Sequence, residues 1–242
     1  MVPPRNRTGR LTLFGDFKMF AQTAVRTVND INAAMTRVYQ YMFLAVVSSL
    51  GVAWYVSVTP ALMAFFFTGA MAWVTILSPL AFIFLVPVLF NSGMGKGGMI
   101  ATLLAFASLM GLSMSAMLAA YTALSVVQAL MGAAVLFLTM TLYGYTTQKS
   151  LDSWGGFLLV GLISIIVVSL INLFIGSSVL AMVVSAAAVL IFLGLTAYDT
   201  QKIKEQLATS NSPAVEVYGA LSLYLDFINL FIHLLQLFGQ RK

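Results

Sequence analysis

The chain has 242 residues, of which 61% are hydrophobic and only 8% are charged. Because soluble globular domains carry about 25% charged residues, this composition excludes a soluble globular protein and indicates a polytopic membrane protein. The sequence contains no cysteine, which excludes disulfides, thiolate metal sites and cysteine nucleophiles. The formal net charge of +5 lies mostly in the loops and the N-terminal tail, where it indicates orientation in a membrane rather than nucleic-acid binding.

The N-terminal stretch, residues 1–35, is predicted to be a basic tail that carries Arg5, Arg7, Arg10 and Lys18. Such a tail would lie near anionic lipid headgroups. Within it, residues 19–35 have the pattern of a short amphipathic helix at the membrane interface. Residues 36–242 then form the transmembrane domain, with membrane lipids as its surroundings.

Apolar runs long enough to cross a bilayer, about 20 residues each, occur repeatedly after this tail. In chain order they cover residues 37–58, 61–90, 99–119, 124–145, 155–175, 179–199 and 217–238. The second run is overlong and contains Pro79 and Pro87, so we expect it to tilt or kink. The sixth is expected to continue as a helix to about residue 207. We therefore predict an all-α integral membrane protein with seven transmembrane helices.

The basic residues alternate between the connections. The first, third and fifth loops contain no Lys or Arg, whereas the tail and the second, fourth and sixth loops contain Arg26, Lys96, Lys149, Lys202 and Lys204. This alternation predicts a multi-pass protein with a cytoplasmic N-terminus. Complete crossings would place Arg241 and Lys242 outside, against the same rule. A last segment that spans incompletely would return them to the inside, so the side of the C-terminus stays open.

The last apolar run carries a polar stripe. Ser222, Asp226, Asn229, His233 and Gln236 follow one another at spacings of four, three, four and three residues. On an α-helix these positions share one face. A carboxylate in mid-bilayer costs at least a few kcal/mol, so Asp226 must face protein or water. The last helix therefore belongs inside a bundle, with its stripe toward a partner helix.

Asp199, at the end of the preceding run, is the best candidate partner for Asp226. Two carboxyl groups in contact cannot both ionise cheaply and would share a proton. A hydrogen bond between them could hold the pair closed. Full deprotonation, or a divalent cation in place of the proton, would open it. Oxygen ligands suit hard cations such as Ca²⁺, although two carboxylates alone bind weakly.

Plainer interpretations stand beside this one. Asp226 could be a neutral acid that a hydroxyl or amide on a neighbouring helix satisfies. Asp199 could simply be hydrated at a cytoplasmic helix end. His233 is the only histidine, which indicates a hydrogen-bonded packing residue rather than a zinc ligand.

Three segments together resemble the Bax inhibitor-1 family, also called the TMBIM or lifeguard family. They are residues 221–239 (LSLYLDFINLFIHLLQLFG), residues 194–203 (GLTAYDTQKI) and residues 144–149 (GYTTQK) followed by Leu151. Arg37-Val38-Tyr39 is similar to the family's entry into its first helix. The short loops suggest a bacterial member of the inner membrane.

The resemblance implies a seven-helix arrangement in which the last helix is central and surrounded by the other six. It also implies a pH-sensitive Ca²⁺ leak channel that transports or weakly binds Ca²⁺, holds no cofactor tightly, and uses Asp199 and Asp226 as pH sensor and Ca²⁺ gate. Ser222, Asn229 and His233 would support this pair. The sequence departs from some bacterial members, which have an acidic residue within the second helix and an arginine near its end. Here the second run is uncharged, and Lys96 is the nearest basic residue.

Other functions fit the sequence less well or less specifically. An intramembrane aspartyl protease also pairs aspartates from two helices, but its Gly-x-Gly-Asp motif is replaced here by Leu223-Tyr224-Leu225-Asp226. We therefore expect no enzyme. A retinal protein is excluded because the last helix has no lysine. The alternative is a non-conducting regulator that binds a membrane protease of the FtsH type, a role that the resemblance to bacterial relatives also implies.

Overall fold

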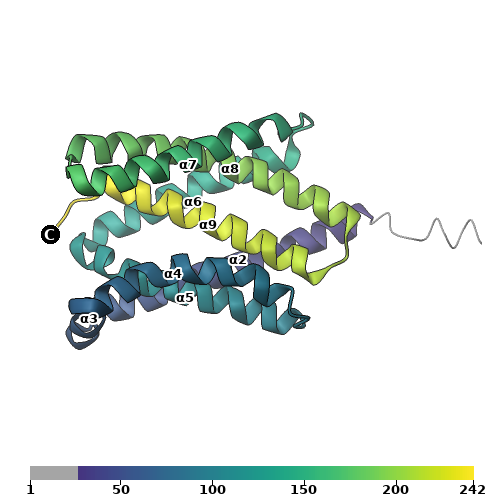
Figure 1. Cartoon of the computed structure of the whole chain (residues 1–242). Coiled ribbons are helices and arrows are strands. Elements are labelled where there is room, and N and C mark those ends of the chain that lie inside the picture. The colour runs from purple at the N-terminus through teal and green to yellow at the C-terminus, as the bar shows by residue number, and fades with distance from the viewer. Residues whose placement is uncertain (1–26) are drawn as a thin grey trace, which may run out of the picture.

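The computed structural model describes residues 27–242 and is almost entirely helical. The helices are α2 (Val28–Ser57), α3 (Pro60–Phe66), α4 (Gly69–Phe90), α5 (Lys96–Ala120), α6 (Ala123–Thr146), α7 (Asp152–Ile175), α8 (Ser178–Thr209) and α9 (Pro213–Phe238). Within the described range, all except the short α3 are long and apolar enough to cross a membrane, which makes seven candidate spans. They run alongside one another as a bundle (Figure 1). The prediction of an all-α protein with seven membrane-spanning helices is confirmed.

The first long helix begins earlier than predicted. The Thr27 side chain accepts a hydrogen bond from the Asp30 backbone nitrogen at 3.2 Å, and the Asp30 carboxylate accepts one from the Thr27 backbone nitrogen at 3.1 Å. This capping box starts α2 at Val28. Residues 28–35, predicted as part of the tail, are therefore the first turns of α2. The rest of the predicted tail and interfacial helix lies outside the described residues.

The overlong second run is divided into two helices. α3 ends at Phe66 and α4 begins at Gly69, whose φ of 59° lies in the left-handed region that favours glycine. The Thr75 hydroxyl donates to the Phe66 carbonyl at 3.0 Å and so satisfies one of the free acceptors at the end of α3. Pro79 and Pro87 lie within α4. The sequence predicted a distortion at the prolines but not this break before Gly69.

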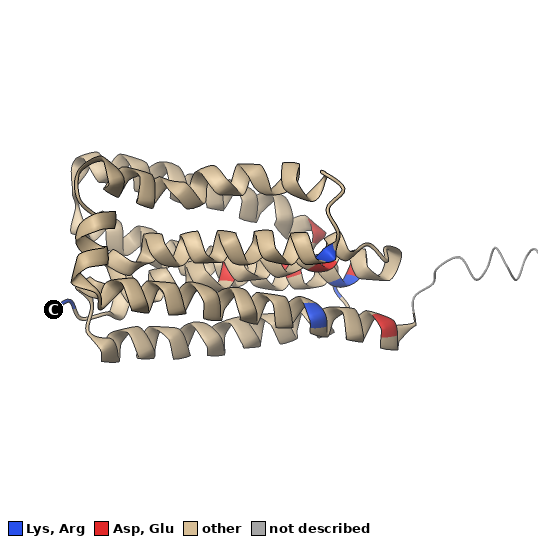
Figure 2. Cartoon of the chain, turned by 90° about the horizontal axis from the view of Figure 1, so that it is seen from below, with Lys and Arg blue, Asp and Glu red and all other residues tan. Residues whose placement is uncertain are grey.

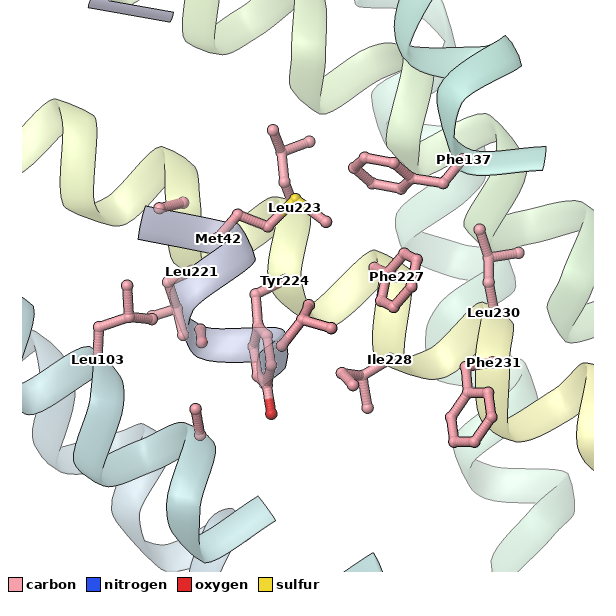
Figure 3. Close-up of a cluster of buried hydrophobic side chains, with 14 of the residues drawn as sticks. Met42, Leu103, Phe137, Leu221, Leu223, Tyr224, Phe227, Ile228, Leu230 and Phe231 are labelled. Carbon is pink, nitrogen blue, oxygen red and sulfur yellow. The ribbon is translucent and has the colours of Figure 1, made fainter. Parts of the chain in front are cut away.

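The last helix, α9, is the most deeply buried of the candidate spans. It packs along α8, α2 and α6, and more lightly along α5. Its apolar face forms the centre of the core (Figure 3), where the Phe227 ring meets Phe137 of α6 edge-on at 5.6 Å. Because lipid tails are as apolar as these side chains, close packing rather than exclusion from water holds the helices together.

The two ends of the described chain lie at opposite ends of the bundle (Figure 1). α9 runs the full length of the bundle, and the residues after it are tied to the α5–α6 connection. The Thr122 backbone nitrogen donates to the Gln240 carbonyl at 3.0 Å, and the Lys242 nitrogen donates to the Ala120 carbonyl at 3.0 Å. The last segment therefore does not turn back, and Arg241 and Lys242 lie at the end opposite to Val28.

Candidate functional site

The central feature of the site is Asp226, halfway along α9. Thirteen residues of the helix precede it and twelve follow (Pro213–Phe238). The side chain is buried, with 4% of its surface exposed. Its Oδ2 atom has no hydrogen-bond partner among the residues that the structure describes. The structure thus offers this oxygen neither the hydroxyl nor the amide that a merely structural acid would require.

Asp199 lies on α8 and faces the same region. It is half-buried, and the Ser222 hydroxyl of α9 donates a hydrogen bond to its Oδ2 atom. Asp199 and Asp226 line one cavity of about 640 Å³. The two predicted residues therefore line the same cavity, but the predicted hydrogen bond between their carboxyl groups is not formed, because Asp199 binds Ser222 and the Asp226 Oδ2 atom has no partner.

The rest of the polar stripe continues along α9 away from this pair. The Asn229 amide donates to the Leu225 carbonyl of its own helix at 2.8 Å. His233 Nδ1 lies 3.4 Å from the Ser185 hydroxyl and 3.2 Å from the Gln236 side-chain oxygen, and its ring stacks on Phe192. His233 is thus hydrogen-bonded and packed, as expected of a lone histidine on a helix that faces the bundle.

The cavity has two chemically different sides. Its polar side comes from α8 and α9 and consists of Asp199, Ser222, Asp226, Asn229 and His233. The side formed by α7 and α4 is mainly apolar and consists of Leu80, Leu162, Ile165, Ile166, Leu170 and Leu173, together with one hydroxyl residue, Ser169. We call it the central cavity.

A second cavity of about 760 Å³ lies between α8 and α9, toward the end of the bundle where α2 begins. It is more polar, since Lys202, Gln206 and Tyr218 line it. Both cavities are lined by Asp199, Ser222 and Leu225. The hydrogen bond between Ser222 and Asp199 is therefore formed by two residues that line both cavities.

The motifs that carry the family resemblance contact one another. Gln201 of α8 accepts a hydrogen bond from the Leu151 backbone nitrogen at 2.7 Å and donates one to the Lys149 carbonyl at 2.9 Å. Gly144 of α6 faces the Ala197 carbonyl so closely that any side chain there would collide with it. These contacts fix α8 against α6 and the α6–α7 connection, and so they position Asp199.

An ion cluster that the sequence did not predict lies at the start of α9. Glu216 is 5% exposed. Its Oε1 atom accepts from Arg37 of α2 at 2.6 and 3.0 Å, and its Oε2 atom accepts from Lys96 of α5 at 2.8 Å. Lys96 thus binds Glu216 and is not the partner of the aspartate pair. Each of the three residues lies near the end of an apolar run in the sequence. The sequence did not show that they pair, because pairing depends on which helices are neighbours in the bundle.

Most charged residues lie at the end of the bundle where α2 begins, and basic residues also lie at the C-terminal end (Figure 2). Asp226 is buried halfway along α9, apart from both groups. In the described part of the chain, His, Asp and Glu side chains form no cluster of three or more that could hold a metal ion. A cation at the aspartate pair would instead meet two carboxyl groups and the side-chain oxygens of Ser222 and Asn229, which are ligands of the kind that hard cations prefer.

Fold and site together define a polytopic α-helical membrane protein with a buried, unpaired acid in its innermost helix. Residues 31–242 match the family described as inhibitor of apoptosis-promoting Bax1 (Bax1-I), and the chain belongs to this family. Members of the family are membrane proteins. The resemblance noted in the sequence is thereby confirmed.

Several curated relatives of the chain come from bacteria. The inner membrane protein YbhL of Escherichia coli K12 is 37% identical over 215 residues, which cover 86% of this chain and 92% of the relative. An uncharacterized protein of Rickettsia prowazekii is 35% identical, over 86% of this chain and 89% of the relative. An uncharacterized protein of Deinococcus radiodurans is 31% identical, over 93% of this chain and 97% of the relative. The matches to these relatives extend over most of the helical bundle.

Proposed function

We propose that the protein is a pH-sensitive Ca²⁺ leak channel of the bacterial inner membrane, gated by Asp199 and Asp226. The observation that carries this proposal is the unpartnered carboxyl oxygen of Asp226, buried halfway along a helix of membrane-spanning length. Intramembrane acids with this environment mark ion and proton paths. Among the described residues, more Lys and Arg lie at the end where α2 begins than at the opposite end, which has Arg241 and Lys242, and this excess supports a cytoplasmic N-terminus.

The proposed gate works through the charge of the pair. Burying an ionised carboxylate without a partner is costly, so Asp226 holds a proton in the closed state, while the Ser222 hydroxyl stabilises an ionised Asp199. When Asp226 loses its proton, two negative charges repel each other in a medium of low dielectric constant. The repulsion separates α8 from α9 at the Ser222–Asp199 contact and attracts a divalent cation. The chain's own groups bind and release Ca²⁺ and protons, and the proposal includes no catalytic step.

The test is Ca²⁺ influx into liposomes that hold the purified protein, measured from about pH 5 to pH 8. Wild type should conduct more at the high end of this range. Asp226→Asn and Asp199→Asn should give a flux that no longer depends on pH. Glu205→Gln is the matched control, because Glu205 is a half-exposed acid of α8 that does not line the central cavity. A pH response that survives in Asp226→Asn would contradict the gate.

A non-conducting regulator of a membrane protease is the alternative. It predicts no flux at any pH from folded protein, together with a protease that co-purifies only when residues 1–35 are present. The described residues offer no feature that favours it over the leak channel.

A further inference from the structure

The central cavity opens toward the surroundings of the bundle. Figure 1 shows α9 running between the α4–α5 pair and the α7–α8 pair. Side chains that line the cavity from α7 also belong to the outer surface, since Ile166 is 50%, Leu170 53% and Leu173 78% exposed. Leu80, on the α4 side, is 59% exposed. The composition places this surface in hydrocarbon, so a molecule that enters here comes from the bilayer and must itself be lipophilic.

The inner wall of the cavity requires more than an alkyl chain. Asp226 presents a buried oxygen without a partner, and Asp199 lines the same wall. Among the described residues that line the cavity, none is a lysine or an arginine. An acyl chain alone would leave the Asp226 oxygen unsatisfied. An amine that enters as the free base would take up the proton that Asp226 holds in the closed state, and the resulting ammonium group would donate a charge-assisted hydrogen bond to the carboxylate.

We propose that the central cavity binds lipophilic amines, with the ammonium group at Asp226 and the alkyl chain along α7 against Leu162, Ile166 and Leu170. The volume of about 640 Å³ lies within the range of roughly 300–1,000 Å³ of ligand pockets. Apolar walls with a few convergent polar groups are also typical of such pockets. This inference concerns the same aspartate pair as the proposed function and assigns it a class of ligand.

Binding of dodecylamine to the protein in nanodiscs of phosphatidylcholine tests the proposal, with dodecanol as the uncharged probe of equal chain length. Wild type should bind the amine more tightly than the alcohol by about tenfold or more, the value of one hydrogen bond to a charged group. Asp226→Asn should lose this preference, while Glu205→Gln should keep it. Equal binding of amine and alcohol by wild type, or an undiminished preference in Asp226→Asn, would overturn the proposal.

A second variant tests the alkyl wall without touching the acid. Leu170 is 53% exposed, so a tryptophan there can be accommodated without repacking the core while it fills the cavity from α7. Leu170→Trp should weaken binding of amine and alcohol alike and leave thermal stability near that of wild type. Unchanged amine binding in this variant would contradict the assigned position of the chain.

Failure of this inference can be told apart from failure of the channel proposal, because binding is measured without ion flux. Amine binding that depends on Asp226 in a protein that passes no Ca²⁺ would support the ligand site and overturn the channel. If both proposals hold, bound amine should reduce Ca²⁺ influx in wild type, and Leu170→Trp should lessen that inhibition.

Discussion

Two carboxyl groups on α9, ten residues apart, are buried to nearly the same extent but differ in their hydrogen-bond partners and in their position in the bundle. Glu216 is 5% exposed and binds two cations, whereas Asp226 is 4% exposed and has an oxygen without a partner. By helix rise they are separated by about 15 Å. The first joins three helices at one end of the bundle, and the second faces a cavity in its interior. Burial alone therefore does not distinguish a structural acid from a functional one, but the set of partners does.

We expect the largest loss of folding stability when Glu216, the acid that binds two cations, is replaced by a neutral residue. Glu216→Gln leaves Arg37 and Lys96 without their shared anion. Breaking a buried ion pair costs about 3–5 kcal/mol, and because the two cations are partly exposed we expect about 2–3 kcal/mol here. Thermal unfolding in detergent measures this loss. Glu205→Gln, which removes a half-exposed partner of Lys202, should cost less than about 0.5 kcal/mol. Equal losses in the two variants would contradict a structural role for Glu216.

Removing one cation at a time should have a smaller effect, because Glu216 keeps the other. Arg37 makes two hydrogen bonds to Glu216 and Lys96 makes one. We expect Arg37→Met to cost about 1–2 kcal/mol and Lys96→Met about 1 kcal/mol. A double-mutant cycle with Glu216→Gln should give the larger coupling energy for Arg37. The reverse order would show that the Lys96 contact dominates the cluster.

A still smaller stability effect is expected at Ser222, which touches the functional acid pair. Ser222→Ala removes the hydroxyl that donates to Asp199, at a cost of about 0.5–1.5 kcal/mol. Because that hydrogen bond joins α8 to α9 in the closed state and is broken on opening, its loss should ease opening and move the midpoint of Ca²⁺ influx to lower pH. An unmoved midpoint in a conducting Ser222→Ala protein would separate Ser222 from the gate.

The smallest stability effect is expected at Asp226 itself. Asparagine has nearly the same shape, and Asp226→Asn breaks no hydrogen bond at the Oδ2 atom, because none is present there. Since the substitution also removes the possibility of an unpaired buried charge, we expect a change within about 1 kcal/mol. A loss as large as that of Glu216→Gln would mean that Asp226 is a structural acid after all.

The sequence predicted those features that depend on a single helix. Apolar runs identified the spans, and the spacing of Ser222, Asp226, Asn229 and His233 identified the face of α9 that meets α8 and the cavity. The cluster at Glu216 was not predictable in this way, because Arg37 is 179 residues and Lys96 is 120 residues away in the chain. The lack of a hydrogen-bond partner for Asp226 was also not predictable, because the spacing of polar residues on α9 does not show which groups a neighbouring helix places beside them.

The most direct test of the account is Ca²⁺ influx as a function of pH for Glu216→Gln and Asp226→Asn in parallel liposome preparations. Each variant replaces one buried carboxyl group of α9 by an amide of similar shape. The account predicts that folded Glu216→Gln keeps the pH response of wild type and that Asp226→Asn loses it. A pH response that persists in Asp226→Asn and disappears in folded Glu216→Gln would contradict the assignment of the two acids.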